Sequence, residues 1–177
     1  MGQFNQVLEK YARYVIQQSR SNLTKAGKGR GKLYDSLEYF IQDTRVTFKS
    51  EEYGVFVDKG VKGKDPSKVS PNAKIKGQQA PNSKYRFGSG KSNKTFKDFA
   101  RNMSVWAKSK NIRFRDEKGR FAKGGYKSLG YVIASNIYNR GIRPTMFFTK
   151  PFEAGIVKYS DEMIEAIFND NIKLWVI

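Results

Sequence analysis

Residues 3–23 read QFNQVLEKYARYVIQQSRSNL, and this stretch is the strongest structural signal in the chain. Its apolar residues recur every three or four positions, which predicts an amphipathic helix, because such positions share one helix face. A helix with one apolar face needs other elements to cover it, and the rest of the chain supplies candidates. The predicted inward residues are Phe4, Val7, Leu8, Tyr11, Ala12, Val15, Ile16, Ser19 and Leu23.

The stretch after this helix predicts a β-hairpin. Lys25–Lys32 (KAGKGRGK) indicates a flexible basic loop, and 33–37 is long enough for one helical turn. Apolar and polar residues then alternate over about 37–50, around a tight turn at Asp43-Thr44, as in an antiparallel hairpin. Glu51–Lys59 (EEYGVFVDK) fits either one helical turn or a strand.

The second half of the chain predicts three further helices. Thr95, with Asp98 three residues later, matches a capping box that begins the first helix. The second helix starts at Tyr126 and ends at Gly141, and Pro151 opens the third. The predicted inward residues are Phe96, Phe99, Met103 and Trp106 in the first, Tyr126, Leu129, Ile133 and Ile137 in the second, and Phe152, Ile156, Met163, Ile164 and Ile167 in the third.

Three shorter stretches predict extended structure. Residues 112–121 suit a hairpin, and the tail 172–177 is strand-like and apolar, so we expect it to be buried. Residues 142–148 (IRPTMFF) cannot continue a helix because of their proline. In a strand Phe147 and Phe148 point to opposite faces, so we expect one ring in the core and the other against a neighbouring subunit.

Composition excludes several classes of protein. The chain has 177 residues, of which 38% are hydrophobic and 14% aromatic, enough for one domain with a core. It has no cysteine and no histidine, which excludes disulfides, thiolate nucleophiles, Ser-His-Asp catalysis and ordinary structural zinc sites. We expect neither a transmembrane helix nor a signal peptide, since no apolar run has the required length or flanks.

The charge is concentrated in the middle of the chain. The net charge of +18 comes from 34 basic and 16 acidic residues. Residues 59–127 hold 20 of the basic residues and only four of the acidic ones. Such a segment repels itself unless a polyanion or an acidic protein surface neutralises it. Within it, 60–93 is rich in proline, glycine and serine and predicts a long loop.

No motif supports an enzyme. Gly88–Ser92 (GSGKS) resembles the end of a phosphate-binding loop, but Tyr85 stands where that loop needs its first glycine. Glu51 and Glu52 are adjacent and would point apart on a strand, and the glutamates of the last helix lie on its polar face. We therefore expect no catalytic residue, no metal and no cofactor.

Basic and aromatic residues alternate in two places, around Tyr85 and Phe87 and around Phe114 and Phe121. Such alternation suits nucleic acid, with cations for phosphates and rings for bases. It also suits an acidic protein surface, or a plain hairpin whose rings face the core. No base-reading module is visible. The candidate residues for contact with a polyanion or an acidic partner are Lys84, Arg86, Lys91, Lys94, Arg113, Arg115 and Arg120.

Two short motifs carry a family resemblance. The first is Tyr53-Gly-Val-Phe-Val-Asp-Lys-Gly60, and the second is Arg143-Pro-Thr-Met-Phe-Phe148, which precedes the last helix. In this order of elements the chain resembles the tail-completion or neck proteins of tailed double-stranded DNA phages. The resemblance covers residues 1–60 and 126–170. It does not cover 61–125, which holds nearly all the excess charge.

The resemblance implies a non-enzymatic virion protein, made in the host cytoplasm, in a ring at the head–tail junction. Its partners would be copies of itself and the portal, adaptor or tail proteins of the virion. It would contact packaged DNA without sequence preference, and it would not bind a membrane. We expect one α+β domain over 1–177, a small antiparallel sheet packed on three or four helices with a basic insertion at about 61–125. The expected subunit-interface residues are Tyr53, Phe56, Val57, Arg143, Phe147, Phe148, Leu174 and Trp175.

The alternative function is a general nucleic-acid-binding protein of the ribosome- or nucleoid-associated type. It would use the same basic segment, 59–127, as its binding surface.

Overall fold

The computed structural model describes residues 2–90, 95–115 and 118–172. Over these residues the chain forms six α-helices and two two-stranded antiparallel sheets, which confirms the predicted α+β class. The chain divides into two compact units. Unit 1 consists of Met1–Asp58 and Thr145–Ile177, and unit 2 is Lys59–Pro144. The expected insertion at about 61–125 lies inside unit 2.

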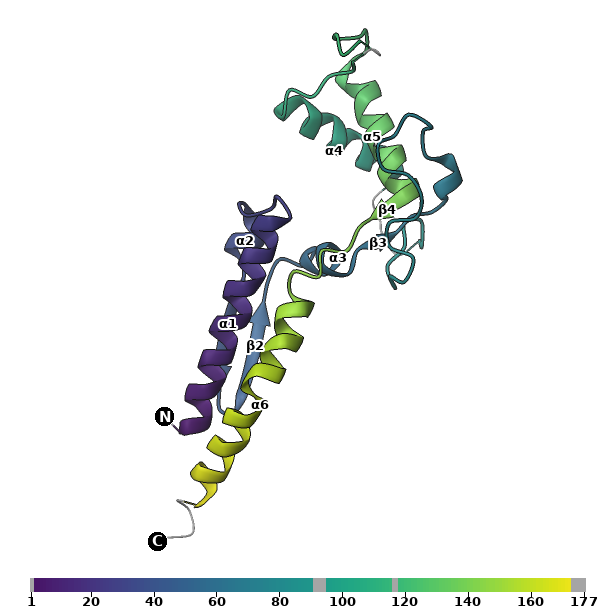
Figure 1. Ribbon diagram of the computed structural model, residues 1–177. Coiled ribbons are helices and arrows are strands. Elements are labelled where there is room, and N and C mark those ends of the chain that lie inside the picture. Colours follow the sequence, from purple (N-terminus) through teal and green to yellow (C-terminus); the bar gives the residue numbers. More distant parts are fainter. Residues whose placement is uncertain (1, 91–94, 116–117, 173–177) are drawn as a thin grey trace. The chain divides into compact units, whose positions relative to one another are not determined.

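Two long antiparallel helices form the frame of unit 1 (Figure 1). They are α1 (Gln3–Lys25) and α6 (Thr149–Ile172). At one end the Asp170 carboxylate accepts hydrogen bonds of 3.0 Å from the backbone N–H groups of Gln3 and Phe4, the free N–H groups of the first turn of α1. The predicted inward face of α1 is confirmed, since every residue of it except the half-buried Phe4 is buried.

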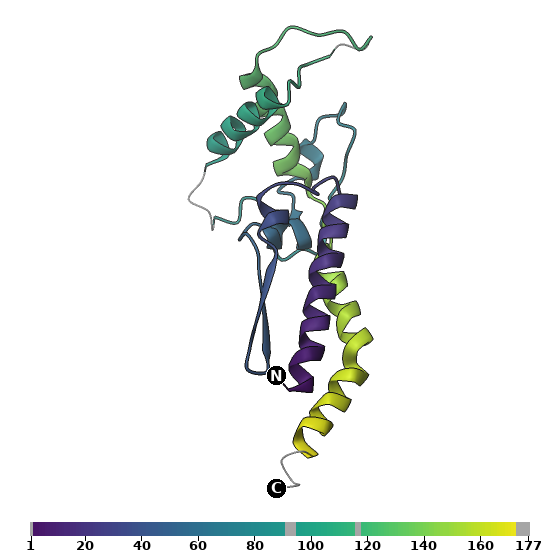
Figure 2. The same ribbon diagram turned by 90° about the vertical axis from the view of Figure 1, so that its left-hand side faces the viewer.

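The predicted hairpin packs beside α1 (Figure 2). The short helix α2 (Lys32–Asp35) leads into β1 (Glu38–Gln42), which pairs with β2 (Arg45–Lys49) around the predicted turn. Asp43 has φ 54° there, a left-handed conformation that aspartate tolerates in tight turns. One cluster in the buried core of this unit consists of Ile16, Leu23, Leu33, Leu37 and Phe147.

An aromatic cluster joins α1, the hairpin and α6. Tyr11 contacts Phe48 and Phe152 edge to face, with ring centroids 6.0 Å apart in both pairs. Phe148 contacts Phe48 at 5.3 Å. Burial raises the pKa of the Tyr11 hydroxyl to about 12. Such edge-to-face pairs add stability beyond the burial of their area.

Unit 2 is built around the helices α4 (Phe96–Ser109) and α5 (Tyr126–Arg140). The capping box predicted at Thr95 and Asp98 is confirmed. Gly130 lets the two helices approach closely, since a Cβ there would lie 2.5 Å from the backbone nitrogen of Ser104. The unit also contains the strands β3 (Val61–Lys62) and β4 (Gly141–Ile142), which pair with each other, and the 3₁₀ turn η1 (Pro66–Lys68).

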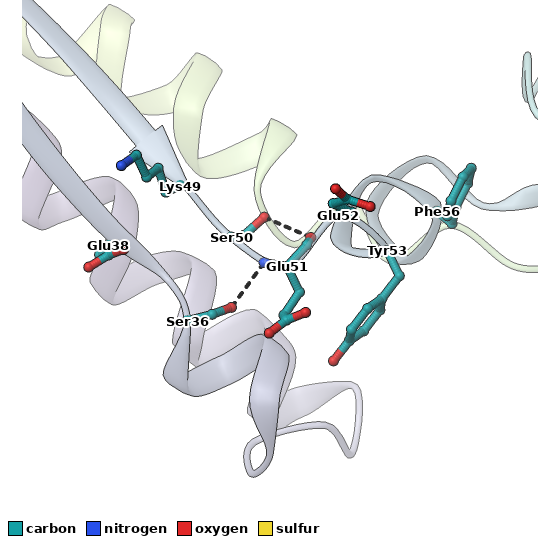
Figure 3. Close-up of a pocket in the computed structure, with 8 residues that line it drawn as sticks. All are labelled: Ser36, Glu38, Lys49, Ser50, Glu51, Glu52, Tyr53 and Phe56. Atoms are coloured by element: carbon teal, nitrogen blue, oxygen red, sulfur yellow. Dashed lines mark hydrogen bonds between the residues drawn. The ribbon is translucent and has the colours of Figure 1, made fainter.

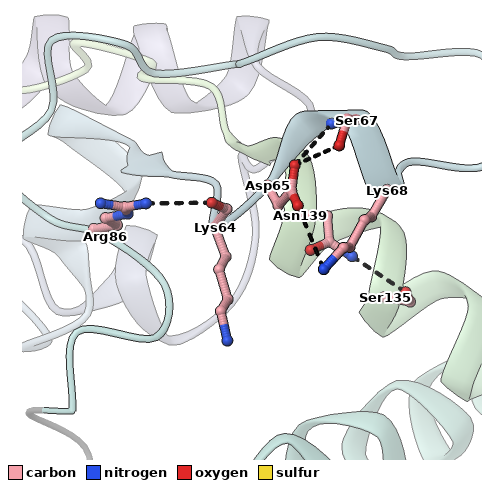
Figure 4. A network of polar contacts seen from close by, with 7 residues as sticks. All are labelled: Lys64, Asp65, Ser67, Lys68, Arg86, Ser135 and Asn139. Carbon is pink, nitrogen blue, oxygen red and sulfur yellow. Dashed lines mark hydrogen bonds and ion pairs between the residues drawn. The ribbon is translucent and has the colours of Figure 1, made fainter.

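The long segment after β3 is tied to the rest of unit 2 by hydrogen bonds. The Gln78 side chain bonds both the N–H and the C=O of Gly63, at 2.6 and 3.2 Å. Figure 4 shows Arg86 donating to the Lys64 carbonyl and Asp65 accepting from Ser67. This serine bond lowers the pKa of Asp65 below its ordinary value.

Several predicted elements differ from the structure. Trp106 is 44% exposed, and Ala107 takes the buried position of α4 instead. The predicted hairpin over 112–121 is reduced, among the described residues, to one bridge between Arg115 and Phe121. Of the inward residues predicted for the last helix, Ile156, Ile164 and Ile167 are exposed. The ambiguous stretch 51–59 contains a helix, α3 (Gly54–Lys59).

Candidate interaction site

The two motif segments meet at Asp58. This buried carboxylate accepts hydrogen bonds from the backbone N–H groups of Phe148 and Thr149, at 2.8 and 3.2 Å, and from the Thr149 hydroxyl. The N–H groups that begin α6 therefore bond to an acidic side chain about ninety residues earlier in the sequence. Negative charge at a helix N-terminus is favourable because of the free N–H groups and the helix dipole.

Backbone bonds reinforce this contact. The N–H of Thr145 donates to the Val57 carbonyl at 3.1 Å, and the N–H of Met146 donates to the Asp58 carbonyl at 3.0 Å. Met146 takes φ 52° at this point, an uncommon value for a residue with a side chain. The extended structure predicted over 142–148 is a strand only at Ile142, the last residue of β4, and the extended course is broken at Met146.

Phe147 and Phe148 consequently do not lie on opposite faces of a strand. Phe147 is 2% exposed in the core, and the partly buried Phe148 packs against the same cluster. Phe147 therefore takes the expected core position, and the strand geometry that would turn Phe148 to an opposite face is absent, so its contact with a neighbouring subunit stays a prediction. The alternation of side chains along a strand does not apply, because both residues lie in the turn that precedes α6.

The structure also explains why the last residue of the first motif, Gly60, is a glycine. Its φ is 71°, and an added Cβ would lie 2.6 Å from the Ile142 carbonyl and 2.7 Å from the Pro144 nitrogen. Within unit 2 this glycine therefore allows β3 to start against the segment that follows β4. No other residue fits both the conformation and the close contact.

Tyr53 and Phe56 lie beside an acidic hollow in unit 1. They are 44% and 41% exposed, whereas Val57 packs against the core. The hollow has a volume of about 570 Å³ and is also lined by Glu38, Glu51 and Glu52 and by one cation, Lys49. Figure 3 shows these side chains around the end of β2, where the Ser36 hydroxyl accepts a bond of 3.0 Å from the Glu51 N–H. The hollow thus combines aromatic surface with three carboxylates.

The predicted basic residues lie on two segments of unit 2. Arg113 and Arg115 both stack on the Phe121 ring, at 5.6 and 4.5 Å from its centroid. Lys84 stacks on its neighbour Tyr85 at 5.1 Å. Phe121 is 61% exposed, so this ring and its two guanidinium groups form an open basic and aromatic surface.

The remaining residues expected at an interface or a polyanion-binding surface are either exposed or outside the described part of the chain. Arg143 is exposed, and its place at a subunit interface stays a prediction. Arg120 lies beside Phe121 in the sequence. Lys91, Lys94, Leu174 and Trp175 lie outside the described residues.

Two apolar surfaces were missed by the sequence analysis. The first is a face of α6 that includes Val157 and Phe168, which are 78% and 64% exposed. The second is a groove between α4 and α5, which includes Val105 and Tyr131, 65% and 59% exposed. The spacing of Val157, Ile164 and Phe168 at helical intervals was the available signal for the first surface.

The exposed apolar surfaces and the basic and aromatic surface around Phe121 are suited to binding other macromolecules. The described residues hold no group of three acidic side chains placed to bind a metal ion. No helix in the described part of the chain has the length and apolar character that a membrane span requires. No protein-family model, no curated protein and no solved structure matches the chain. The family resemblance therefore stays a prediction.

Proposed function

We propose that this chain is a non-enzymatic structural protein of a tailed double-stranded DNA phage, one subunit of a ring at the head–tail junction. The observation that carries the proposal is the separation of charge between the two units. Unit 2 holds 22 basic and four acidic residues, whereas unit 1 holds 12 of each, so the whole net charge of +18 belongs to unit 2. A ring around a DNA channel needs a basic surface and, separately, surfaces that join its subunits.

The exposed apolar residues of unit 1 support the second requirement. Tyr53, Phe56 and the open face of α6 are exposed apolar residues, and exposed apolar patches commonly mark contacts between proteins. The motif resemblance supplies the place of the ring in the virion, because neck proteins assemble between portal and tail. The partners would be further copies of this chain and the portal, adaptor or tail proteins of the same virion.

Purified protein tests the proposal. We expect closed rings of one size in electron micrographs and a matching mass by light scattering, either alone or on addition of a portal protein. Duplex DNA should bind weakly and without sequence preference, with an affinity that falls steeply as salt increases. A protein that stays monomeric under all these conditions contradicts the proposal.

The basic and aromatic surface around Phe121 favours the alternative, a general nucleic-acid-binding protein. Stacked arginines on an exposed ring can hold phosphates and one unstacked base together. A dedicated binder should bind nucleic acid at nanomolar concentrations as a monomer or dimer. The same purified sample, measured for mass and for DNA affinity, distinguishes the two functions.

A further inference from the structure

Helix α6 has one apolar face that its own unit does not cover. Val157, Ile164 and Phe168 are 78%, 55% and 64% exposed, and their spacing of seven and four residues places them on one side of the helix. The opposite side packs on α1 through small residues such as Gly155, where an added Cβ would lie 2.8 Å from the Tyr11 ring. The exposed side is therefore a surface without a partner among the described residues.

This face is bordered by negative charge. Asp161 and Glu165 are exposed and one helical turn apart, next to the apolar residues. Over Thr149–Ile172 there are five acidic and two basic residues, which makes α6 the one net-negative helix in the described part of the chain. A partner for this face should therefore offer apolar surface with a basic border.

Unit 2 contains a groove with that chemistry. It lies between α4 and α5, has a volume of about 1000 Å³, and is floored by apolar side chains that include Phe96, Ala100, Tyr131 and Val132. The Phe96 and Tyr131 rings stand edge to face, with centroids 5.5 Å apart. The floor is therefore a packed apolar surface that is open on one side.

The border of the groove is basic. Lys97 and Arg101 project from successive turns of α4, and Lys127 lies on the α5 side. All three are exposed. The one acidic residue in this stretch, Asp98, is engaged in the capping box with Thr95. The groove thus presents positive charge to whatever occupies it.

The two surfaces also match in dimensions. Val157 and Phe168 are eleven residues apart, which is about 16 Å along a helix, and the lining residues Phe96 and Val105 of α4 span about 14 Å. Asp161 and Glu165 are four residues apart, as are Lys97 and Arg101, so both charge pairs have the spacing of one helical turn.

We propose that the α4–α5 groove of one copy binds α6 of a neighbouring copy. The apolar floor argues against DNA as the occupant, and the complementary helix is present on every copy of the chain. The contact joins different surfaces of two subunits, so repetition gives either a closed ring or an open filament. This inference names the contact by which the proposed ring would assemble. That the contact closes into a ring, and does not extend into a filament, rests on the proposed function.

Cysteine cross-linking tests the contact directly, because the natural chain has no cysteine. One sample carries Val105→Cys in the groove, and a second carries Ile164→Cys on α6. After mixing and mild oxidation we expect a disulfide-linked heterodimer well above the homodimers that each variant forms alone. Because each chain has a single cysteine, the product cannot form within one chain. The control pairs Val105→Cys with Val55→Cys, a 39% exposed position outside the α6 face.

Charge reversal provides the second test. Arg101→Glu should raise the concentration needed for assembly at least about tenfold, since like charges would face each other. Adding Asp161→Arg to the same chain should restore assembly. The control is Lys108→Glu, which makes the same change on α4 outside the groove and should have little effect. Thermal unfolding of each variant verifies that the helices remain folded.

The outcomes separate the two proposals. Rings that form without the heterodimer, or that tolerate Arg101→Glu, overturn this contact and leave the proposed function standing. A natural protein that remains monomeric, alone and with a portal, overturns both. If Arg101→Glu weakens DNA binding and leaves assembly unchanged, the groove is a DNA surface and the inference is wrong.

Discussion

At the scale of single residues, Asp58 determines how the two motif segments join. Its carboxylate has several backbone and hydroxyl donors and is 5% exposed. An amide in the same place would turn one acceptor into a donor that faces other donors. A buried group that loses its partner in this way costs more than the hydrogen bond is worth.

We therefore expect Asp58→Asn to lower the free energy of unfolding by about 1–3 kcal/mol, measured by urea denaturation with a helix signal. Asp35→Asn, at an exposed position on α2, is the control and should change stability by no more than about 0.5 kcal/mol. Equal effects of the two substitutions would show that Asp58 does not hold the start of α6.

The role of Asp58 was beyond the reach of local sequence patterns. The motif marked the residue as notable, but its partners are 90 residues away and no periodicity connects them. Met146 is a related case. Its positive φ accompanies the hydrogen bond from its own N–H to the Asp58 carbonyl, and that bond exists only in the folded chain.

At the scale of helices and strands, the sequence predicted those features that depend only on residues close together in the chain. The helix over 3–23, the turn at Asp43 and the capping box at Thr95 were all predicted because each depends on neighbouring residues. The last helix is apolar on two sides, so its pattern does not say which side meets α1. The side that meets α1 includes the buried Gly155 and Ala166 and the Phe152 ring, which contacts Tyr11, whereas Val157, Ile164 and Phe168 stay exposed.

Replacing Gly130 with alanine should change stability in the direction opposite to the usual one. Replacing glycine by alanine inside a helix normally adds up to about 1 kcal/mol of stability. At Gly130 the new Cβ would lie 2.5 Å from the backbone of α4, so the two helices would have to separate. We expect Gly130→Ala to destabilise unit 2 and to distort the groove, as measured by thermal unfolding and by assembly. Ser109→Ala, at an exposed position of α4 outside the groove, is the control and should be neutral or slightly stabilising.

The cap of α4 makes the stability of unit 2 depend on pH. The hydrogen bonds of Asp98 with Thr95 lower the pKa of this carboxyl below its ordinary value of 3.8. A carboxyl with a lowered folded pKa contributes stability that is fully present above the unfolded pKa and is lost as pH falls through the folded one. The difference in stability between the natural chain and Asp98→Asn should therefore be constant near neutral pH and vanish in acid. A difference that grows as pH falls below 3.8 would contradict this assignment.

At the scale of the whole molecule, the charge of unit 2 governs contact with DNA. Replacing Lys84, Arg113 and Arg120 with glutamine should weaken duplex binding equally for all sequences. It should also reduce the dependence of log affinity on log salt by roughly one for each phosphate that the protein no longer neutralises. Fluorescence anisotropy across a salt series measures both. Lys25, Arg45 and Lys150, changed together in unit 1, remove the same charge and should alter the slope much less. Equal slopes for the two triple variants would contradict a DNA surface on unit 2.

The pairing of β3 with β4 has a consequence for the order in which the chain folds. Unit 2 is continuous in sequence, whereas unit 1 is assembled from the two ends of the chain and must close a loop over everything between them. The entropy cost of that closure grows with loop length. Once Val61 pairs with Ile142, both ends of the intervening segment are already close together. During synthesis α1 emerges before unit 2 and its partner α6 emerges after it, so we expect unit 2 to fold while the apolar stripe of α1 is still uncovered. Once folded, unit 2 would hold the two segments of unit 1 close together and so lower the entropy cost of joining them.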